Sequence, residues 1–118
     1  MNVDQLAESL RRDQSFMENV VRWAELPARE ARYGDFPPEL DARLLPVLRQ
    51  RGVTRLYSHQ AQSIAATLRG EDVVVVTPTA SGKTMCYNLP VLSSILSNPD
   101  ARALYLFPTK ALSADQVS

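Results

Sequence analysis

The fold expected for this chain follows from one stretch, Asp72-Val73-Val74-Val75-Val76-Thr77-Pro78-Thr79-Ala80-Ser81-Gly82-Lys83-Thr84. Its four consecutive valines suit a strand that is buried on both faces, as in a parallel sheet. A short loop follows, and the apolar pattern beyond it predicts a helix over residues 82–96, with a kink at Pro90. Strand, loop and helix in this order form the setting in which phosphate-binding loops occur.

The residue types at the end of that stretch suit a nucleoside triphosphate. Free N–H groups at a helix N-terminus present partial positive charge to phosphate, and Gly82 lets the backbone approach without a Cβ. Lys83 supplies a cation for the β- and γ-phosphates, and the Thr84 hydroxyl is a hard oxygen ligand for Mg²⁺. We therefore predict catalytic roles for Lys83 and Thr84, with Thr84 as the metal ligand. The predicted cofactor-binding residues of the loop are Thr79, Ala80, Ser81, Gly82, Lys83 and Thr84.

The loop departs from the general G-x-x-x-x-G-K-[ST] pattern, because Thr77 stands where the first glycine would be. A Gly-Lys-Thr tripeptide alone arises easily by chance and would then be a surface turn. The expected strand before it and the expected helix after it favour the phosphate loop over that alternative.

The rest of the chain fits an α/β architecture with an added helical segment. Residues 103–107 read as a second buried strand, so strand, helix and strand follow one another with a right-handed crossover. Apolar residues at helical spacing from Val3 to Ala24 predict an N-terminal helical segment with Asn2 as N-cap. A proline-rich loop follows at 26–38, then a helix from near Pro38 to Gly52, then one capped by Ser58 and ending at Gly70. We expect an N-terminal helical and linker extension at 1–36 and the N-terminal part of an ATP-binding domain from 37 to 118.

The composition is that of an ordinary globular protein, with 45% hydrophobic and 22% charged residues. Thirteen basic and thirteen acidic residues cancel, so any nucleic-acid contact must come from local placement of donors rather than from a basic field. Cys86 is the only cysteine, which excludes an internal disulfide and fits a reducing compartment. The charged N-terminus does not resemble a signal peptide, and the valine run is too short to span a bilayer. We therefore expect a soluble, cytoplasmic protein without a membrane partner.

Three ordered segments resemble the superfamily 2 DEAD/DEAH-box helicases. Residues 77–84 resemble motif I, in which that first glycine is commonly replaced, and Leu56-Tyr57-Ser58-His59-Gln60 resembles the adenine-recognition motif. Phe107-Pro108-Thr109-Lys110-Ala111-Leu112 resembles motif Ia. Together with Leu26-Pro27-Ala28-Arg29-Glu30-Ala31-Arg32-Tyr33, these segments are most similar to the RecQ-related MrfA/YprA-type subgroup. The resemblance implies part of the first RecA-like P-loop NTPase lobe, a parallel sheet with flanking helices.

The resemblance implies that Gln60 selects ATP by pairing with adenine. A glutamine amide offers one acceptor and two donors, which can match N6–H and N7 of the base. The alternative is a surface glutamine, which Gln62 exemplifies two residues later. Tyr57 is a candidate to stack on the adenine ring, or else a core tyrosine. His59 is expected to cap or pack locally, and Cys86 to be a small core residue.

The resemblance assigns nucleic-acid binding to Pro108, Thr109 and Lys110. A hydroxyl, a cation and backbone N–H groups at the end of a parallel strand can hold a phosphate backbone without reading base sequence. The alternative for Lys110 is a solvated loop lysine. The subgroup resemblance favours DNA over RNA, and the sequence indicates no protein partner.

Parts of a complete motor are not found in the 118 residues. The family supplies an Asp-Glu motif and arginines from a second lobe for hydrolysis, and neither Asp-Glu-x-Asp nor Asp-Glu-x-His occurs here. In RecA-like sheets other strands lie between the two expected strands, so their edges would be unpaired. We therefore expect the chain alone to be inactive, marginally stable and prone to aggregate. The alternatives to a helicase are a translocase that remodels without unwinding, a non-catalytic nucleotide-binding module, and an unrelated P-loop kinase.

Overall fold

The computed structural model describes residues 1–78 and 82–115, which form two compact units. One unit comprises Met1–Glu30 and the other Ala31–Ser118. The boundary between the units thus lies before the 36/37 boundary expected from the sequence, because a short strand at Tyr33–Gly34 pairs within the second unit. No helix within the described part of the chain is both long enough and apolar enough to cross a membrane.

The N-terminal unit contains two helices, α1 at Val3–Arg12 and α2 at Gln14–Met17. Asn2 caps α1 as predicted: its side chain accepts from the Gln5 N–H, and the Gln5 side chain accepts from the Asn2 N–H. The helical pattern does not continue unbroken to Ala24, because Asp13 ends α1 in extended backbone and caps α2 through the Phe16 N–H. None of the residues in these two helices is buried.

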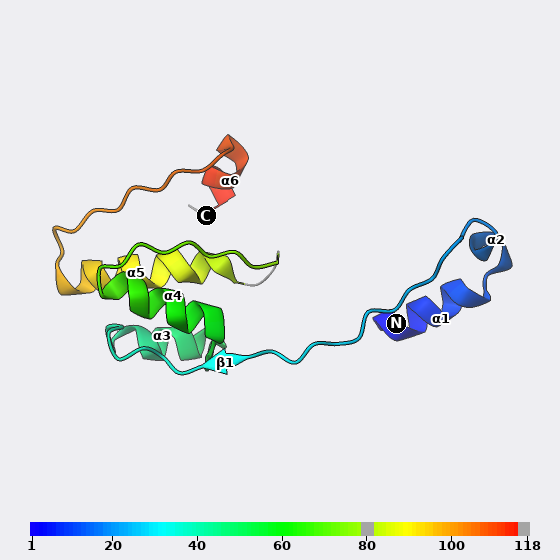
Figure 1. Cartoon of the computed structure of the whole chain (residues 1–118), viewed down its shortest axis with the longest axis horizontal. Coiled ribbons are helices and arrows are strands. Elements are labelled where there is room, and N and C mark those ends of the chain that lie inside the picture. The colour runs from blue at the N-terminus through cyan, green and yellow to red at the C-terminus, as the bar shows by residue number, and fades with distance from the viewer. Residues whose placement is uncertain (79–81, 116–118) are drawn as a thin grey trace. The chain divides into compact units, whose positions relative to one another are not determined.

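The second unit is built on three helices that lie side by side (Figure 1): α3 at Leu44–Gln50, α4 at Ser58–Leu68 and α5 at Lys83–Ser97. Gly52 and Gly70 follow α3 and α4 with φ of 79° and 85°, so both predicted stop signals are confirmed. Tyr57 rather than Ser58 is the N-cap of α4. A short helix, α6, begins at Lys110 and includes residues to Asp115.

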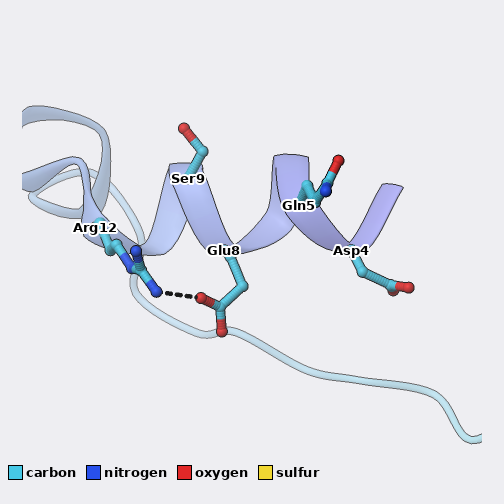
Figure 2. A pocket seen from close by; sticks show the side chains of 5 residues that line it. All are labelled: Asp4, Gln5, Glu8, Ser9 and Arg12. Carbon is cyan, nitrogen blue, oxygen red and sulfur yellow. Dashed lines mark hydrogen bonds and ion pairs between the residues drawn. The ribbon is translucent and has the colours of Figure 1, made fainter. Parts of the chain in front are cut away.

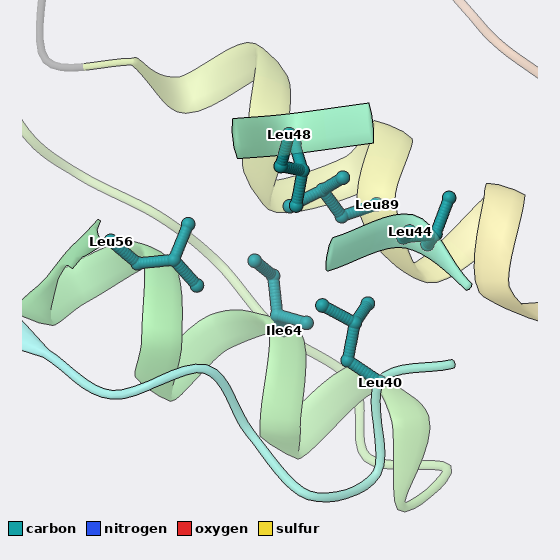
Figure 3. Packing of buried hydrophobic residues seen from close by; sticks show 6 residues of the cluster. All are labelled: Leu40, Leu44, Leu48, Leu56, Ile64 and Leu89. Carbon is teal, nitrogen blue, oxygen red and sulfur yellow. The ribbon is translucent and has the colours of Figure 1, made fainter. Parts of the chain in front are cut away.

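Leucine and isoleucine side chains from all three helices and the segments before them form the core (Figure 3). Ile64 of α4 and Leu56 just before it are fully buried, at 0% exposure. The buried cluster consists of Leu40, Leu44, Leu48, Leu56, Ile64 and Leu89. These residues recur at helical spacing, so one apolar stripe on each helix is enough to hold the layer together.

Within the described residues the only sheet pairs β1, Tyr33–Gly34, with β2, Leu56–Tyr57, in antiparallel register. Tyr33 lies opposite Tyr57, and Gly34 lies opposite Leu56. A Cβ added to Gly34 would come within 2.9 Å of the Ala61 Cβ on α4, so only glycine allows this ribbon to lie on the helix.

Residues 72–77 and 103–107, expected as buried strands of a parallel sheet, do not form strands in the described structure. Figure 1 shows both as elongated, irregular segments. The expectation of burial on both faces is wrong for this structure: Val74 and Val76 are each 89% exposed, and Leu104 is 86% exposed. The physical reason is that a strand cannot satisfy its own N–H and C=O groups and needs a neighbour on the sheet.

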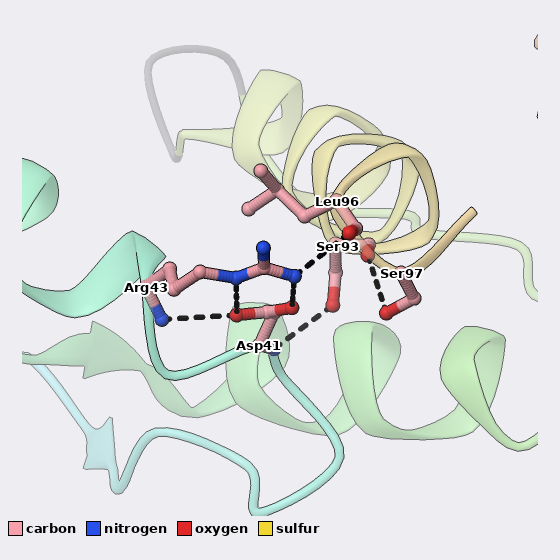
Figure 4. A network of polar contacts seen from close by, with 5 residues as sticks. All are labelled: Asp41, Arg43, Ser93, Leu96 and Ser97. Carbon is pink, nitrogen blue, oxygen red and sulfur yellow. Dashed lines mark hydrogen bonds and ion pairs between the residues drawn. The ribbon is translucent and has the colours of Figure 1, made fainter. Parts of the chain in front are cut away.

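A polar network fastens the start of α3 to the end of α5 (Figure 4). The Arg43 guanidinium donates two hydrogen bonds to Asp41, at 2.9 and 2.7 Å, and one of 2.7 Å to the Leu96 carbonyl. The Asp41 N–H donates to the Ser93 hydroxyl at 2.9 Å. Hydrogen bonding from Arg43 lowers the pKa of Asp41 to about 2. The network therefore orients α5, the helix that follows the predicted phosphate loop.

Candidate functional site

The predicted phosphate loop ends at Gly82, which is the N-cap of α5. Gly82 has φ 73° and ψ 31°, a left-handed conformation that favours glycine. Its carbonyl accepts from the Met85 N–H at 3.2 Å and so begins the helix. Lys83 and Thr84 are then the first two residues of α5, and Thr84 is exposed. Their backbone N–H groups belong to the helix end whose donors have no intrahelical partner, where an anion is favoured.

The Lys83 ammonium contacts backbone oxygens of residues 77 and 78. Its Nζ donates to the Thr77 carbonyl at 2.6 Å and lies 3.3 Å from the Pro78 carbonyl. These carbonyl oxygens are weaker partners for a cation than ionised phosphate oxygens would be. Three predicted cofactor-binding residues, Thr79, Ala80 and Ser81, lie outside the described residues.

Gln60 joins the start of α4 to the end of the phosphate loop. Its Oε1 accepts from the Tyr57 N–H at 2.9 Å, and its Nε2 donates to the Gly82 carbonyl at 2.9 Å. The residue is only 3% exposed. The surface alternative considered for Gln60 is therefore wrong in this structure, whereas Gln62 is exposed.

Tyr57 lies in a stack of aromatic rings at the β1–β2 ribbon. Its ring is parallel to that of Tyr33, with centroids 5.4 Å apart, and to that of His59, with centroids 5.9 Å apart. The Arg55 guanidinium lies 3.6 Å from the centroid of Tyr33. Tyr57 is 40% exposed, so the alternative of a tyrosine buried in the core is wrong for this structure. A base that stacks on Tyr57 must join or replace these partners.

A cavity of about 750 Å³ adjoins the phosphate loop and the two elongated apolar segments. Lys83 and Thr84 line it together with Pro108, one of the predicted nucleic-acid-binding residues. Pro108, Thr109 and Lys110 are all exposed, and Lys110 is the first residue of α6. Burial, with the nearby Tyr87, raises the pKa of Tyr105, whose hydroxyl donates to Asn88 at 3.2 Å. Residues of the phosphate loop and of the motif Ia segment thus line the same cavity, whereas Gln60 and Tyr57 do not line it.

A second hollow, of about 510 Å³, lies along α1 in the N-terminal unit (Figure 2). It is lined by Asp4, Gln5, Glu8, Ser9 and Arg12, and Arg12 donates to Glu8 at 2.6 Å. None of the predicted site residues lies there. Among residues 1–78 and 82–115 there is no group of three His, Cys, Asp or Glu side chains that could hold a metal ion.

Sequence reasoning missed the contact between Gln60 and Gly82 and the stack of Tyr33 on Tyr57. Both join residues far apart in the sequence, and they depend on how α4 packs against α5 and how β1 pairs with β2. No local pattern signals such a contact, since periodicity and capping describe only neighbouring residues.

The chain is similar to several known helicases. It is 54% identical over 101 residues to the ATP-dependent helicase YprA of Bacillus subtilis, which covers 86% of the chain and 14% of that protein. It is 34% identical to the ATP-dependent helicase hrq1 of Schizosaccharomyces pombe, over 98% of the chain and 11% of that protein. The chain thus spans about a seventh or less of the length of these relatives.

A crystal structure of the DUF1998 helicase MrfA bound to DNA and AMPPNP matches the fold with a TM-score of 0.81 at 46% identity. The match covers 98% of the chain and 16% of that protein. Because this structure is that of a helicase, the described fold is that of a segment of a RecA-like helicase lobe. Residues 57–118, more than half of the chain, match the DEAD/DEAH box helicase family. Phosphate loop, adenine-motif glutamine and motif Ia segment all fall within these residues, and the chain belongs to the DEAD/DEAH box helicase family.

Proposed function

We propose that this chain is the ATP-binding segment of an ATP-dependent DNA helicase, which couples ATP hydrolysis to movement along nucleic acid. The observation that carries the proposal is the contact between Gln60 and Gly82. It brings the glutamine of the adenine motif against the glycine that begins the phosphate-loop helix, although the two residues lie 22 positions apart. A base and a triphosphate tail of one nucleotide must be held at once, and this contact supports the proposal because it joins one candidate for the base to one candidate for the phosphates.

In the proposed site Lys83 neutralises the β- and γ-phosphates, after its ammonium leaves the carbonyls of Thr77 and Pro78. Charge-assisted hydrogen bonds to phosphate are stronger than those to neutral carbonyls, which favours the exchange. Thr79, Ala80, Ser81 and Gly82 complete the loop around the phosphates, and Gln60 and Tyr57 recognise the base. Lys83 and Thr84 are the proposed catalytic residues of this segment.

We assign Mg²⁺ to Thr84. Its exposed hydroxyl in the first turn of α5 is a hard oxygen ligand of the kind that Mg²⁺ accepts, and the described residues offer no rival cluster. Mg²⁺ is usually held by few protein ligands and completed by substrate phosphates and water, so a single threonine fits this role. The ion, when bound, neutralises charge that develops on the phosphates.

Pro108, Thr109 and Lys110 are the proposed contacts to the nucleic-acid backbone. All three are exposed, and Pro108 lines the cavity that also contains Lys83 and Thr84. MrfA was crystallised with DNA, which supports DNA as the partner of this chain.

We further propose that residues 1–36 are an extension to an ATP-binding domain that begins at 37. We also propose that the protein is cytoplasmic, because Cys86 is buried as a free thiol, which suits a reducing compartment.

A parallel sheet is part of the proposal. Residues 72–77 and 103–107 both border the cavity of about 750 Å³ and expose alternate apolar side chains. Val74 and Val76 are nearly fully exposed, whereas Val73 and Val75 are less so and line the cavity. This alternation is that of a strand with one covered face. We propose that further strands of the RecA-like lobe lie between the two segments and pair with their edges, and that flanking helices cover the other face.

The function is tested by ATP hydrolysis in the full-length protein, with and without single-stranded DNA. We expect DNA to stimulate hydrolysis and Lys83→Ala to abolish it. Lys110→Ala is a matched control, because Lys83 and Lys110 are the only lysines in the chain. That variant should keep basal hydrolysis and require more DNA for stimulation. A rate of hydrolysis that is the same with and without DNA would instead indicate an unrelated P-loop kinase. Strand-displacement assays on the full-length protein distinguish a helicase from a translocase that does not unwind.

A further inference from the structure

The elongated segment at residues 103–107 contacts α5 through its aromatic side chains. Tyr105 is 40% exposed, whereas its neighbours Leu104 and Leu106 are 86% and 84% exposed. Successive side chains of an extended chain point to opposite faces, so Tyr105 and Phe107 share one face. The Tyr105 ring lies 5.8 Å from that of Tyr87 on α5, at an angle of 66°, and 6.1 Å from the parallel ring of Phe107. The face of the segment that carries Tyr105 is therefore the face that contacts α5.

A directional contact accompanies the ring contacts. The Tyr105 hydroxyl donates to Oδ1 of Asn88 on α5 at 3.2 Å, between residues that lie 17 positions apart. Burial, with the nearby Tyr87, raises the pKa of Tyr105, so the hydroxyl keeps its proton and remains a donor near neutral pH. Apolar contacts are not directional, whereas a hydrogen bond requires a particular distance and angle. The hydrogen bond to Asn88 therefore fixes the register of the segment along α5.

The aromatic cluster lies between the two sets of proposed site residues. Tyr87 lies one helical turn after Lys83 on α5. Asn88 lies one turn after Thr84, so the members of each pair share a face of the helix. At the other end of the cluster, Phe107 directly precedes the three proposed nucleic-acid contacts at 108–110. The lining of the cavity of about 750 Å³ includes Lys83, Thr84, Tyr87, Phe107 and Pro108.

A change of register would move the proposed nucleic-acid contacts. Within residues 1–78 and 82–115 no strand pairs with the segment, so its side chains set its register. If the segment slipped by one residue, a leucine would face α5 in place of Tyr105, and the hydrogen bond to Asn88 would be lost. Residues 108–110 would then shift by about 3.3 Å, the rise of one residue in an extended chain. A hydrogen bond to a phosphate oxygen does not survive a displacement of this size.

We propose that Tyr105 and Asn88 are positioning residues that couple nucleotide binding at the start of α5 to nucleic-acid binding at residues 108–110. The inference rests on the proposed function, because it joins the two sites of that function. A nucleic-acid backbone held at 108–110 fixes the end of the segment, and the contact with Asn88 carries this constraint to the second turn of α5. Coupling is reciprocal, so a bound nucleotide raises the affinity for DNA by the factor by which DNA raises the affinity for the nucleotide.

The test measures how much a nucleotide strengthens DNA binding by the full-length protein. Fluorescence anisotropy of a labelled oligodeoxythymidylate gives the dissociation constant without and with a Mg²⁺-bound, non-hydrolysable ATP analogue. We define the ratio of the two constants as the coupling factor. Tyr105→Phe removes the hydroxyl and keeps both ring contacts, so the coupling factor should fall about twofold to fivefold, the scale of one neutral hydrogen bond. The affinity for the analogue without DNA should not change.

A second variant removes the other side of the same hydrogen bond. Asn88→Ala deletes the acceptor, and it decides the question if Tyr105→Phe does not fold. The double variant should lower the coupling factor no further than either single variant, because one shared contact is lost. Ser94→Ala is the matched control, since this hydroxyl of α5 donates to the Pro90 carbonyl of the same helix at 2.9 Å. That variant should keep the coupling factor of the unmodified protein.

Two results would overturn the inference. One is a coupling factor of one in the unmodified protein. The other is a lower thermal midpoint in Tyr105→Phe and Asn88→Ala with an unchanged coupling factor, which would show a purely structural contact. In both cases the proposed function stands if DNA stimulates hydrolysis and Lys83→Ala abolishes it. An affinity for Mg-ATP that Lys83→Ala leaves intact would instead refute the proposed function, and the coupling inference with it.

Discussion

The helical layer and the two elongated segments of the second unit both carry apolar side chains, but these side chains differ in burial. Ile64 of α4 is fully buried, whereas Val74 and Leu104 of the elongated segments are 89% and 86% exposed. A helix satisfies its own backbone hydrogen bonds and needs only one packed face. A strand needs a neighbour for its backbone as well as a cover for its side chains. The helices of this chain therefore form without further partners, whereas the two elongated segments need neighbouring strands to form a sheet.

Truncating one side chain in each region is the strongest test of this comparison. Ile64→Ala removes three buried carbons, and we expect the free energy of unfolding to fall by about 2–5 kcal/mol. Val74→Ala should change it by less than about 0.5 kcal/mol in the 118-residue chain, because the side chain is already in solvent. Hydrogen exchange of the α4 amides measures both effects, and comparable losses in the two variants would break the comparison.

Val74→Ala should have a larger effect in the full-length protein than in the 118-residue chain. If further strands complete the proposed sheet, Val74 becomes buried, and Val74→Ala should then cost about 1–3 kcal/mol. Exchange of amides in residues 72–77, slow in the full-length protein and fast in the chain alone, would support the sheet. Fast exchange in both would contradict it.

The contact of Gly34 with α4 should give a smaller effect. An added methyl group would lie 2.9 Å from the Ala61 Cβ, so Gly34→Ala should destabilise the second unit by about 1–3 kcal/mol. Combining it with Ala61→Gly removes the clash, and the double variant should be less destabilised than the sum of the single variants. Thermal unfolding of the three variants measures this coupling, and strictly additive changes would exclude a direct contact.

The smallest expected effect comes from titration of Asp41. Hydrogen bonding from Arg43 lowers the pKa of this carboxyl from 3.8 to about 2. A lowered pKa in the folded state contributes stability that is present above pH 3.8 and is lost as the pH falls toward about 2. Thermal midpoints of the chain and of Asp41→Asn should therefore differ near neutral pH and converge near pH 2. A constant difference across this range would show that the ion pair has no such role.

Much of the helical layer could be predicted from the sequence, because its signals are local. Asn2, Gly52 and Gly70 mark helix ends through capping and positive φ, and the structure confirms them. The cap of α4 was misplaced by one residue, at Ser58 instead of Tyr57, because neighbouring positions compete for that role. The valine run predicted a strand, but no local pattern reports whether a partner strand is available.

The candidate site could be predicted as a set of residues and not as an arrangement. Lys83 and Thr84 were found because a Gly-Lys-Thr sequence before a helix has a known chemical use. The closeness of Gln60 to Gly82 follows from the packing of α4 on α5, which joins residues far apart in the sequence. The parallel stack of Tyr57 with Tyr33 likewise needed the β1–β2 register.

A phosphate loop at the start of α5 can be tested by titrating the full-length protein with Mg-ATP and comparing the unmodified protein with its Lys83→Ala and Lys110→Ala variants. We expect Lys83→Ala to weaken binding by about tenfold to hundredfold, the scale of a charge-assisted contact, and Lys110→Ala to change it by no more than about twofold. Equal affinities for all three proteins would contradict a phosphate loop at the start of α5.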